Sequence, residues 1–369
     1  MHIRAAVARD GNPALSLEDL ELGPLRPNDV LVRIVATGVC HTDLKSASAL
    51  SPVPRPVVLG HEGAGVVEQV GSAVRKLVPG DHVVLTFAFC GQCRSCQEAE
   101  PAYCYHQWPL NFGCRRPDGT TPLRAEAVEN PGPVHGDFFG QSAFATHAIA
   151  EERNAIKVRR DAPLELLGPL GCGIQTGAGA VLNDFALRPG QSLAVFGTGS
   201  LGLSAIMAAR LSGASRIIAV DRHRHRLELA RELGADEAID VNDTPATAEI
   251  MRLTGEGVDF ALDTTGVLPV MREAIDVLAP RGTCGFVTGP WDRRELPVPV
   301  HQLLLGRKIR GIVEGNSNPD LFIPRLVDFF LQGRFPFDRL VSFYPFDAIN
   351  QAFHDVEAGT AIKPILRMP

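Results

Sequence analysis

The chain has 369 residues, of which 45% are hydrophobic and 21% are charged, a balance typical of a soluble globular protein. This length exceeds the ~250–300 residues that a single hydrophobic core usually organises, so we expect two domains. The formal net charge of −6 argues against a surface that neutralises nucleic-acid phosphates.

The first residues, MHIRAAVARDGNPALSLED, carry early charges and lack the apolar stretch of a secretory signal. No uninterrupted apolar run approaches the ~20 residues that a membrane-spanning helix needs. We therefore expect a cytoplasmic protein that binds neither membrane nor nucleic acid. In a reducing cytosol, closely spaced cysteines are metal ligands more often than disulfides.

The first half of the chain predicts an irregular, β-rich domain. Residues 1–170 are rich in Gly and Pro. They contain short strand-like runs at 30–35, 63–70 and 82–87, which alternate between apolar and polar residues.

Four cysteines follow the last of these runs in the pattern C-x2-C-x2-C-x7-C: Cys90, Cys93, Cys96 and Cys104. Four thiolates this close can complete a tetrahedron around Zn(II) and leave no open position, so we interpret the loop as a structural zinc site. The alternative is a zinc ribbon that binds nucleic acid. The acidic sequence QEAEP at 97–101 argues against it, because such a surface needs basic and aromatic residues.

The second half, from about residue 191, alternates apolar strands with helical segments. This alternation predicts a parallel sheet with helices on both faces. After about residue 314 the chain becomes rich in Pro and aromatic residues, and we expect it to return to the first domain. The predicted strands are 192–197, 216–221, 237–241, 258–263, 282–288 and 308–313, and the clearest helices are 201–211 and 224–233.

A glycine motif, G-x-G-x-x-G, joins the first of these strands to the first helix and predicts a dinucleotide site. Gly197 permits the tight turn, Gly199 lets the backbone approach a pyrophosphate, and Gly202 allows close helix–strand packing. The helix would begin at Ser200 and Leu201, where free N–H groups attract phosphate. A doubly wound domain without a nucleotide is the alternative.

Asp221 ends the second strand of this half and bears on the choice of cofactor. A carboxylate there accepts hydrogen bonds from the adenosine ribose and repels a 2′-phosphate, which favours NAD over NADP. Arg222 and Arg226 weaken that preference, because an arginine at this place can accommodate the phosphate.

Three further pieces are far apart in the sequence: Cys40 in TGVCHTD, His61 in GHE and Cys172 in GCG. Each alone is unremarkable, because a lone cysteine is usually a small buried hydrophobe. Together with the four-cysteine loop, the glycine motif and the segments 60–84 and 139–158, they resemble the zinc-dependent medium-chain alcohol dehydrogenases. The resemblance covers nearly the whole chain.

The resemblance implies an α/β fold in which a GroES-like, irregular β-rich catalytic domain accompanies a Rossmann doubly wound parallel sheet. The GroES-like domain would be discontinuous, 1–173 and 313–369, and would carry both zinc sites, while 174–312 would bind NAD. It further implies two zinc ions per chain and a small-molecule alcohol or aldehyde as substrate. A homodimer or homotetramer is expected.

Roles for individual residues also follow from the resemblance. Cys40, His61 and Cys172 would bind the catalytic zinc and leave its fourth position open, a ligand set known for alcohol dehydrogenase. Glu62 would be a carboxylate near the metal. Asp43 would hold the far ring nitrogen of His61 and fix its tautomer.

The proton and cofactor contacts are implied in the same way. Thr42 would stand first in the proton relay. Lys45 occupies the position where the family usually has the relay histidine, and a lysine with a lowered pKa could pass the proton or be a bystander. His41 and Lys363 match basic positions that bind the cofactor pyrophosphate.

The tail 311–343 is most like the aryl-alcohol branch of the family, whose members oxidise benzyl and related allylic alcohols. Aromatic walls suit such flat substrates, although Phe138 and Phe139 could equally close a core. A terpene alcohol such as geraniol or a glutathione adduct would fit the same motifs. A non-catalytic, zinc-stapled NAD-binding protein is a remote alternative. The candidate pocket walls are Thr86, Phe138, Phe139, Trp291 and Val313.

Overall fold

The structure, a computed structural model, describes residues 1–12, 14–125 and 133–369, and separates into two units. The first unit comprises Met1–Cys172, Asn318–Leu331 and Phe337–Pro369. The second comprises Gly173–Ser317 and Gln332–Pro336. Among the helices of the described residues, none is long and apolar enough to cross a membrane.

Two mostly antiparallel sheets form the framework of the first unit. One has the order β4-β1-β2-β7-β8, and the other has the order β10-β6-β5-β3-β18-β17, with β9 also paired to β3. The first sheet contains β1 (His2–Ala8), β2 (Ser16–Leu22), β4 (Val57–Val58), β7 (Leu123–Ala125) and β8 (Pro133–Val134). The second contains β3 (Asp29–Gly38), β5 (Gly63–Val70), β6 (His82–Leu85), β9 (His147–Glu151), β10 (Ala155–Val158), β17 (Val341–Pro345) and β18 (Lys363–Arg367).

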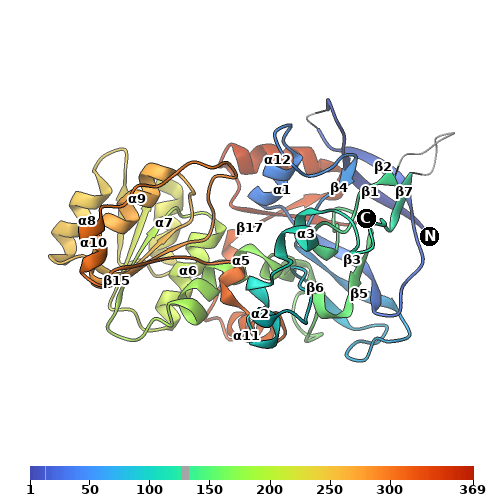
Figure 1. Cartoon of the computed structure of the whole chain (residues 1–369), viewed down its shortest axis with the longest axis horizontal. Helices are drawn as coiled ribbons and strands as arrows, with labels where there is room; N and C mark the ends of the chain where they lie inside the picture. Colours follow the sequence, from blue (N-terminus) through green and yellow to red (C-terminus); the bar gives the residue numbers. More distant parts are fainter. Residues whose placement is uncertain (13, 126–132) are drawn as a thin grey trace. The chain divides into compact units, whose positions relative to one another are not determined.

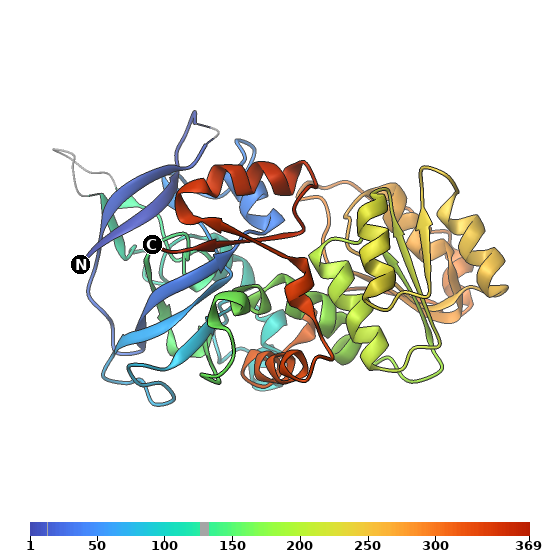
Figure 2. The same ribbon diagram turned by 180° about the vertical axis from the view of Figure 1, so that it is seen from behind.

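The C-terminal segment completes this second sheet, because β18 pairs antiparallel with β3 (Figure 2). The register places Ile365 opposite Gly38, directly before the segment that carries Cys40. This pairing agrees with the predicted return of the chain to the first domain. It matters for the site, since two distant parts of the sequence meet there.

Short helices connect these strands, and α12 lies beside α1 (Figure 1). In α12 the buried residues Ile349, Ala352 and Val356 follow helical spacing, so one face packs on the core. The α-helices of this unit are α1 (His41–Ala47), α2 (Arg94–Gln97), α3 (Gln107–Phe112), α4 (Leu164–Leu167), α11 (Pro319–Leu331) and α12 (Ile349–Glu357). The 3-10 turns are η1 (Pro101–Tyr103), η2 (Phe138–Gly140), η3 (Glu152–Asn154), η4 (Gly168–Gly171), η7 (Phe337–Leu340) and η8 (Phe346–Ala348).

A parallel sheet in the order β13-β12-β11-β14-β15-β16 forms the second unit, with helices on both faces (Figure 1). Its strands are β11 (Ser192–Phe196), β12 (Arg216–Asp221), β13 (Glu237–Asp240), β14 (Val258–Asp263), β15 (Leu278–Phe286) and β16 (Lys308–Gly311). Its helices are α5 (Gly173–Gly179), η5 (Ala180–Asp184), α6 (Ser200–Leu211), α7 (Arg224–Glu232), α8 (Ala246–Thr254), α9 (Leu268–Asp276), α10 (Val300–Leu304) and η6 (Glu314–Asn316).

The predicted alternation of strands and helices is confirmed, and the apolar run of β11 explains why. Residues 193–196 are all fully buried, because a parallel sheet is covered on both faces. The strand predicted at 282–288 starts too late in comparison with β15. Pro280 and Gly282 resemble turn residues, but the strand starts at Leu278 and accommodates them with Arg281 at φ 66° and an irregular register against β14.

The glycine motif packs the start of α6 against the end of β11. Gly197 has φ 91°, a left-handed conformation that glycine adopts without steric cost. At Gly202 an added Cβ would lie 1.9 Å from the carbonyl oxygen of Gly197, so only glycine allows this approach. At Gly199 the described atoms leave the position of a Cβ open to 4 Å.

We predict that Gly202→Ala destabilises the nucleotide-free protein by about 1–3 kcal/mol, the usual cost of forcing extra atoms into a packed site. Gly199→Ala is the matched control and should unfold at the wild-type temperature. Thermal unfolding without nucleotide measures both. Equal melting temperatures of the two variants would contradict this account of the motif.

Candidate functional site

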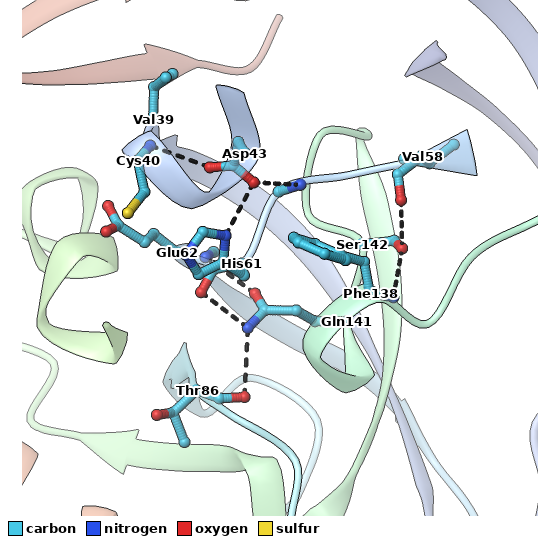
Figure 3. A network of polar contacts seen from close by, with 12 residues as sticks. Val39, Cys40, Asp43, Val58, His61, Glu62, Thr86, Phe138, Gln141 and Ser142 are labelled. Atoms are coloured by element: carbon cyan, nitrogen blue, oxygen red, sulfur yellow. Dashed lines mark hydrogen bonds and ion pairs between the residues drawn. The ribbon is translucent and has the colours of Figure 1, made fainter. Parts of the chain in front are cut away.

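The buried carboxylate of Asp43 joins two segments that the sequence keeps apart (Figure 3). Its Oδ2 accepts a hydrogen bond of 3.0 Å from the backbone N–H of Cys40, which precedes α1. Its Oδ1 accepts from the backbone N–H of Gly60 at 3.1 Å and contacts Nδ1 of His61 at 2.9 Å. Because an ionised carboxylate only accepts, Nδ1 carries a proton, and Nε2 is the nitrogen that the neutral ring offers to a metal.

Four potential metal ligands converge on this place: Cys40, His61, Glu62 and Cys172. Each offers one atom, and these atoms all lie within 4.8 Å of one another. Nε2 of His61 is buried without a hydrogen-bond partner among the described residues, an arrangement that costs free energy unless something binds it. Two thiols and an imidazole are ligands that zinc prefers, so the residues present fit a zinc ion.

The electrostatics of Cys40 agree with a thiolate ligand. Its pKa lies well below the ordinary thiol value, first because the Cys172 thiol hydrogen-bonds to it. Burial opposes this shift, while His61 and the positive charge of Lys363 add to it. A thiolate is the form of cysteine that binds metals.

Glu62 forms a buried ion pair with Lys363. The Nζ atom of Lys363 lies 2.8 and 3.0 Å from the two carboxylate oxygens of Glu62 and donates to the carbonyl oxygen of Val39 at 3.2 Å. Burial alone would lower the pKa of Lys363, but the Glu62 carboxylate outweighs it and the pKa is raised. The lysine is therefore a fixed cation beside the metal ligands.

This position of Lys363 differs from the pyrophosphate contact that the resemblance implied. The side chain is only 1% exposed, and three acceptors within the first unit occupy its three N–H donors. The cause is the strand register, because the backbone N–H of Val39 donates to Pro364 and brings the start of β18 next to the metal site.

The expected proton-relay residues lie on α1, directly after Cys40. Thr42 is half-buried in the first turn, and His41 and Lys45 are exposed. The pKa of Lys45 is lowered because the surrounding protein partly desolvates its ammonium group, against the opposing negative charge of Cys40. The assignment of a relay to Thr42 and Lys45 stays a prediction.

Three of the expected pocket residues surround the metal ligands. Thr86 is buried and its hydroxyl donates to the carbonyl oxygen of Gly171 at 2.7 Å, next to Cys172. Phe139 stacks on the His61 ring at 4.5 Å between centroids, and Phe138 meets the same ring edge-on at 5.6 Å. Both phenylalanines also belong to the hydrophobic core of the first unit. Trp291 and Val313 belong to the second unit.

Two aromatic residues of α3 extend this group and were missed in the sequence. Phe112 packs against Phe139 at 5.1 Å, and Trp108 stacks on Phe112 at 4.4 Å. Trp108 is 49% exposed, so the aromatic contacts run from a buried ligand to the surface of the unit. The spacing of Trp108 and Phe112 could have indicated this pair, because residues four apart lie on one face of a helix.

The four-cysteine loop has the geometry of a closed metal site. The sulfur–sulfur distances are 3.5 Å for Cys93–Cys96, and 3.9 Å for both Cys90–Cys96 and Cys93–Cys104. Zn–S bonds of about 2.3 Å in a tetrahedron place sulfurs about 3.8 Å apart. The residues therefore fit a zinc ion.

Backbone N–H groups point at these sulfurs and favour thiolates. Tyr105 and His106 donate to Cys93 and Cys104 at 3.5 and 3.4 Å. The hydrogen bond from Tyr105 is the main reason that the pKa of Cys93 falls to about 6. The loop thus prepares at least one of its thiols for a metal.

In the second unit, Asp221 stands at the end of β12 beside the glycine turn. One carboxylate oxygen accepts from the backbone and hydroxyl of Thr198 at 2.6 and 2.7 Å, and the other from the backbone of Arg222 at 2.7 Å. Burial would raise the pKa of Asp221, but these donors lower it, so the carboxylate is charged. Ser200 and Leu201 begin α6, and Arg226 is half-buried on α7.

Comparison with known proteins identifies relatives along the whole chain. Residues 26–160 match the alcohol dehydrogenase GroES-like domain, and residues 200–331 match the zinc-binding dehydrogenase domain. A geraniol dehydrogenase from Castellaniella defragrans is 48% identical over 369 residues, covering 98% of this chain and 97% of that protein. A class-3 alcohol dehydrogenase from Myxine glutinosa is 36% identical over 374 residues, covering 100% and 98%.

Solved structures agree with these matches. An alcohol dehydrogenase zinc-binding domain protein from Burkholderia ambifaria superposes with a TM-score of 0.97 and 54% identity, covering 100% of this chain and 99% of that one. A benzyl alcohol dehydrogenase from Acinetobacter calcoaceticus superposes with a TM-score of 0.96 and 44% identity, covering 100% of both chains. The predicted fold class, a GroES-like domain with a Rossmann-like parallel sheet, is confirmed.

We predict that the two cysteine groups bind separate zinc ions with separable effects. Cys172→Ser should lose one of two zinc equivalents and lower the melting temperature by less than Cys96→Ser does, because the bound metal stabilises the folded state but does not cross-link a loop. Cys96→Ser should lose the other and melt lower by at least about 5 °C, because the loop loses its cross-link. Metal analysis with thermal unfolding measures both, and wild-type protein isolated with a single tightly bound zinc would contradict the assignment.

Proposed function

The chain belongs to the zinc-binding alcohol dehydrogenase family, and on that premise we propose that it oxidises a primary aromatic or allylic alcohol reversibly to its aldehyde, with NAD as hydride acceptor. The observation that carries the proposal is the buried cluster of Cys40, His61 and Cys172, in which Nε2 of His61 has no hydrogen-bond partner among the described residues. Such a site holds a metal through three protein ligands and keeps a position for substrate.

The relatives support an unsaturated alcohol as substrate. The names of two of them specify geraniol and benzyl alcohol. In both molecules an unsaturated carbon is attached to the carbon that loses the hydride. The aromatic group that begins beside His61 continues through Phe112 to Trp108, which is 49% exposed, and flat, unsaturated groups stack on rings of this kind.

The chain's own residues orient the reaction and move its proton. A zinc ion bound by Cys40, His61 and Cys172 would act as a Lewis acid that lowers the pKa of an alcohol hydroxyl. Asp43 keeps His61 in the tautomer whose Nε2 faces the metal position. Thr42, two residues after Cys40, would accept the proton of the alcohol and pass it toward solvent.

The cofactor preference is proposed from the second unit. NAD supplies the redox chemistry, and the protein supplies its binding and orientation. The glycine turn and the first N–H groups of α6 would hold the pyrophosphate, and the charged carboxylate of Asp221 would accept hydrogen bonds from the adenosine ribose.

A panel of alcohols tests the proposal directly. NADH absorbance should rise with benzyl alcohol and with an allylic alcohol such as geraniol. We expect kcat/KM to be at least about tenfold higher for these than for the saturated alcohols ethanol and cyclohexylmethanol, because stacking on the aromatic residues adds binding free energy in the transition state. Cyclohexylmethanol is the control for size. Equal values for benzyl alcohol and cyclohexylmethanol would contradict an unsaturated substrate.

We predict that the Asp221 carboxylate selects NAD. Asp221→Gly should reduce the ratio of kcat/KM for NAD over NADP by at least about tenfold, because a like-charge contact with the 2′-phosphate disappears and Arg222 becomes available to it. Asp240→Gly, at the end of the neighbouring strand β13, is the control and should keep the ratio. Equal kcat/KM values of wild type for NAD and NADP would refute the role of Asp221.

A further inference from the structure

The segment between Asp137 and Ser142, called here the aromatic turn, has an unusual backbone. Asp137, Phe139 and Ser142 have φ values of 64°, 53° and 54°, in the left-handed region that non-glycine residues rarely adopt. Gly140 adds a fourth left-handed residue at 65°. Backbone strain of this kind persists only where the surrounding structure fixes it, and it concentrates at functional sites.

Ser142 fixes one end of the aromatic turn (Figure 3). Its buried hydroxyl donates to the carbonyl oxygen of Val58 at 2.7 Å and accepts from the backbone N–H of Phe138 at 2.9 Å. The next two residues hydrogen-bond through their backbone N–H groups to the carbonyls of Gly60 and Leu59, at 2.8 and 3.0 Å. The turn is therefore fastened to the three residues that lead into His61.

Gln141 fixes the other side of the aromatic turn, and its amide hydrogen-bonds to the segment that carries the metal ligand His61 (Figure 3). Its Oε1 accepts from the backbone N–H of Gly63 at 3.1 Å. Its Nε2 donates to the carbonyl oxygens of His61 at 3.0 Å and Thr86 at 3.3 Å. Because one partner can only donate and the other two can only accept, a single amide orientation satisfies all three.

The aromatic turn also fixes the imidazole ring. Phe139 stacks on it with 30° between the ring planes, and Phe138 meets its edge at 84°. Asp43 already holds the Nδ1 atom of His61. The aromatic turn thus holds the backbone and the ring plane of His61, and Asp43 on α1 holds its tautomer.

From these contacts we propose that Gln141 is a positioning residue for the catalytic metal site, which holds the backbone of His61 and Glu62 so that Nε2 of His61 stays aimed at the metal. The inference rests on the proposed function, since it assigns a metal to Cys40, His61 and Cys172. Gln141 is 2% exposed and carries no charge, so its amide acts on the metal only through the segment it holds. Residues that orient metal ligands typically change metal affinity or activity by about 10–100-fold when replaced.

The test compares Gln141→Met with Asn111→Leu. Asn111 is an equally buried amide that also makes three hydrogen bonds to backbone, but its partners are Ala88 and Gln107. Both variants lose three hydrogen bonds at similar side-chain volume, so both should melt lower.

Zinc release from the holoenzyme to a chromogenic chelator is then followed in time. The kinetic phase that is present in the wild type and absent in Cys172→Ser is assigned to the Cys40–His61–Cys172 site.

We expect Gln141→Met to accelerate that phase by about tenfold or more and to lower kcat, while the KM for NAD stays within about twofold. Asn111→Leu should release zinc from this site at the wild-type rate. If Gln141→Met fails to fold, Gln141→Asn replaces it, because it stays uncharged and its amide is one methylene too short to keep all three bonds. Release at the wild-type rate, or equal acceleration in Asn111→Leu, would overturn the inference. If Cys172→Ser instead shows every zinc-release phase of the wild type, the metal site itself would be refuted.

Discussion

The Asp43 carboxylate is the contact on which the rest of the site depends. A fully buried carboxylate is costly unless hydrogen bonds satisfy it, and here three donors from two segments do so. The same three bonds place Cys40 and His61 side by side, although 20 residues of sequence separate them. Satisfying one buried charge therefore brings together two of the three proposed zinc ligands.

A second buried charge, the carboxylate of Glu62, is neutralised by the ammonium group of Lys363. A cysteine thiolate, a glutamate and an aspartate within one buried region would repel one another, and the ammonium of Lys363 offsets part of that negative charge. A divalent cation among Cys40, His61 and Cys172 would offset more, which agrees with the preference of buried charges for paired or metal-bound states. The C-terminal strand β18 thereby contributes to the chemistry as well as to the sheet.

The sequence predicted the parts of this structure that local patterns encode. The parallel sheet followed from the alternation of apolar strands and amphipathic helices, and both cysteine groups followed from spacing and from the family resemblance. The buried place of Lys363 could not be predicted, because it depends on the register between β18 and β3. Gln141 was missed for a similar reason: its role depends on a left-handed turn and on three backbone partners that only the folded chain brings together.

The most direct test of the central claim, that two cysteines and one histidine hold a second zinc ion, is the X-ray absorption spectrum of the fully loaded protein at the zinc edge. A site of four thiolates together with a site of two sulfurs and two lighter ligands gives an average of about three sulfurs at ~2.3 Å and one nitrogen or oxygen at ~2.0–2.1 Å per zinc, with the outer-shell scattering of an imidazole. The account predicts this average. Four sulfurs per zinc, without imidazole scattering, would contradict it.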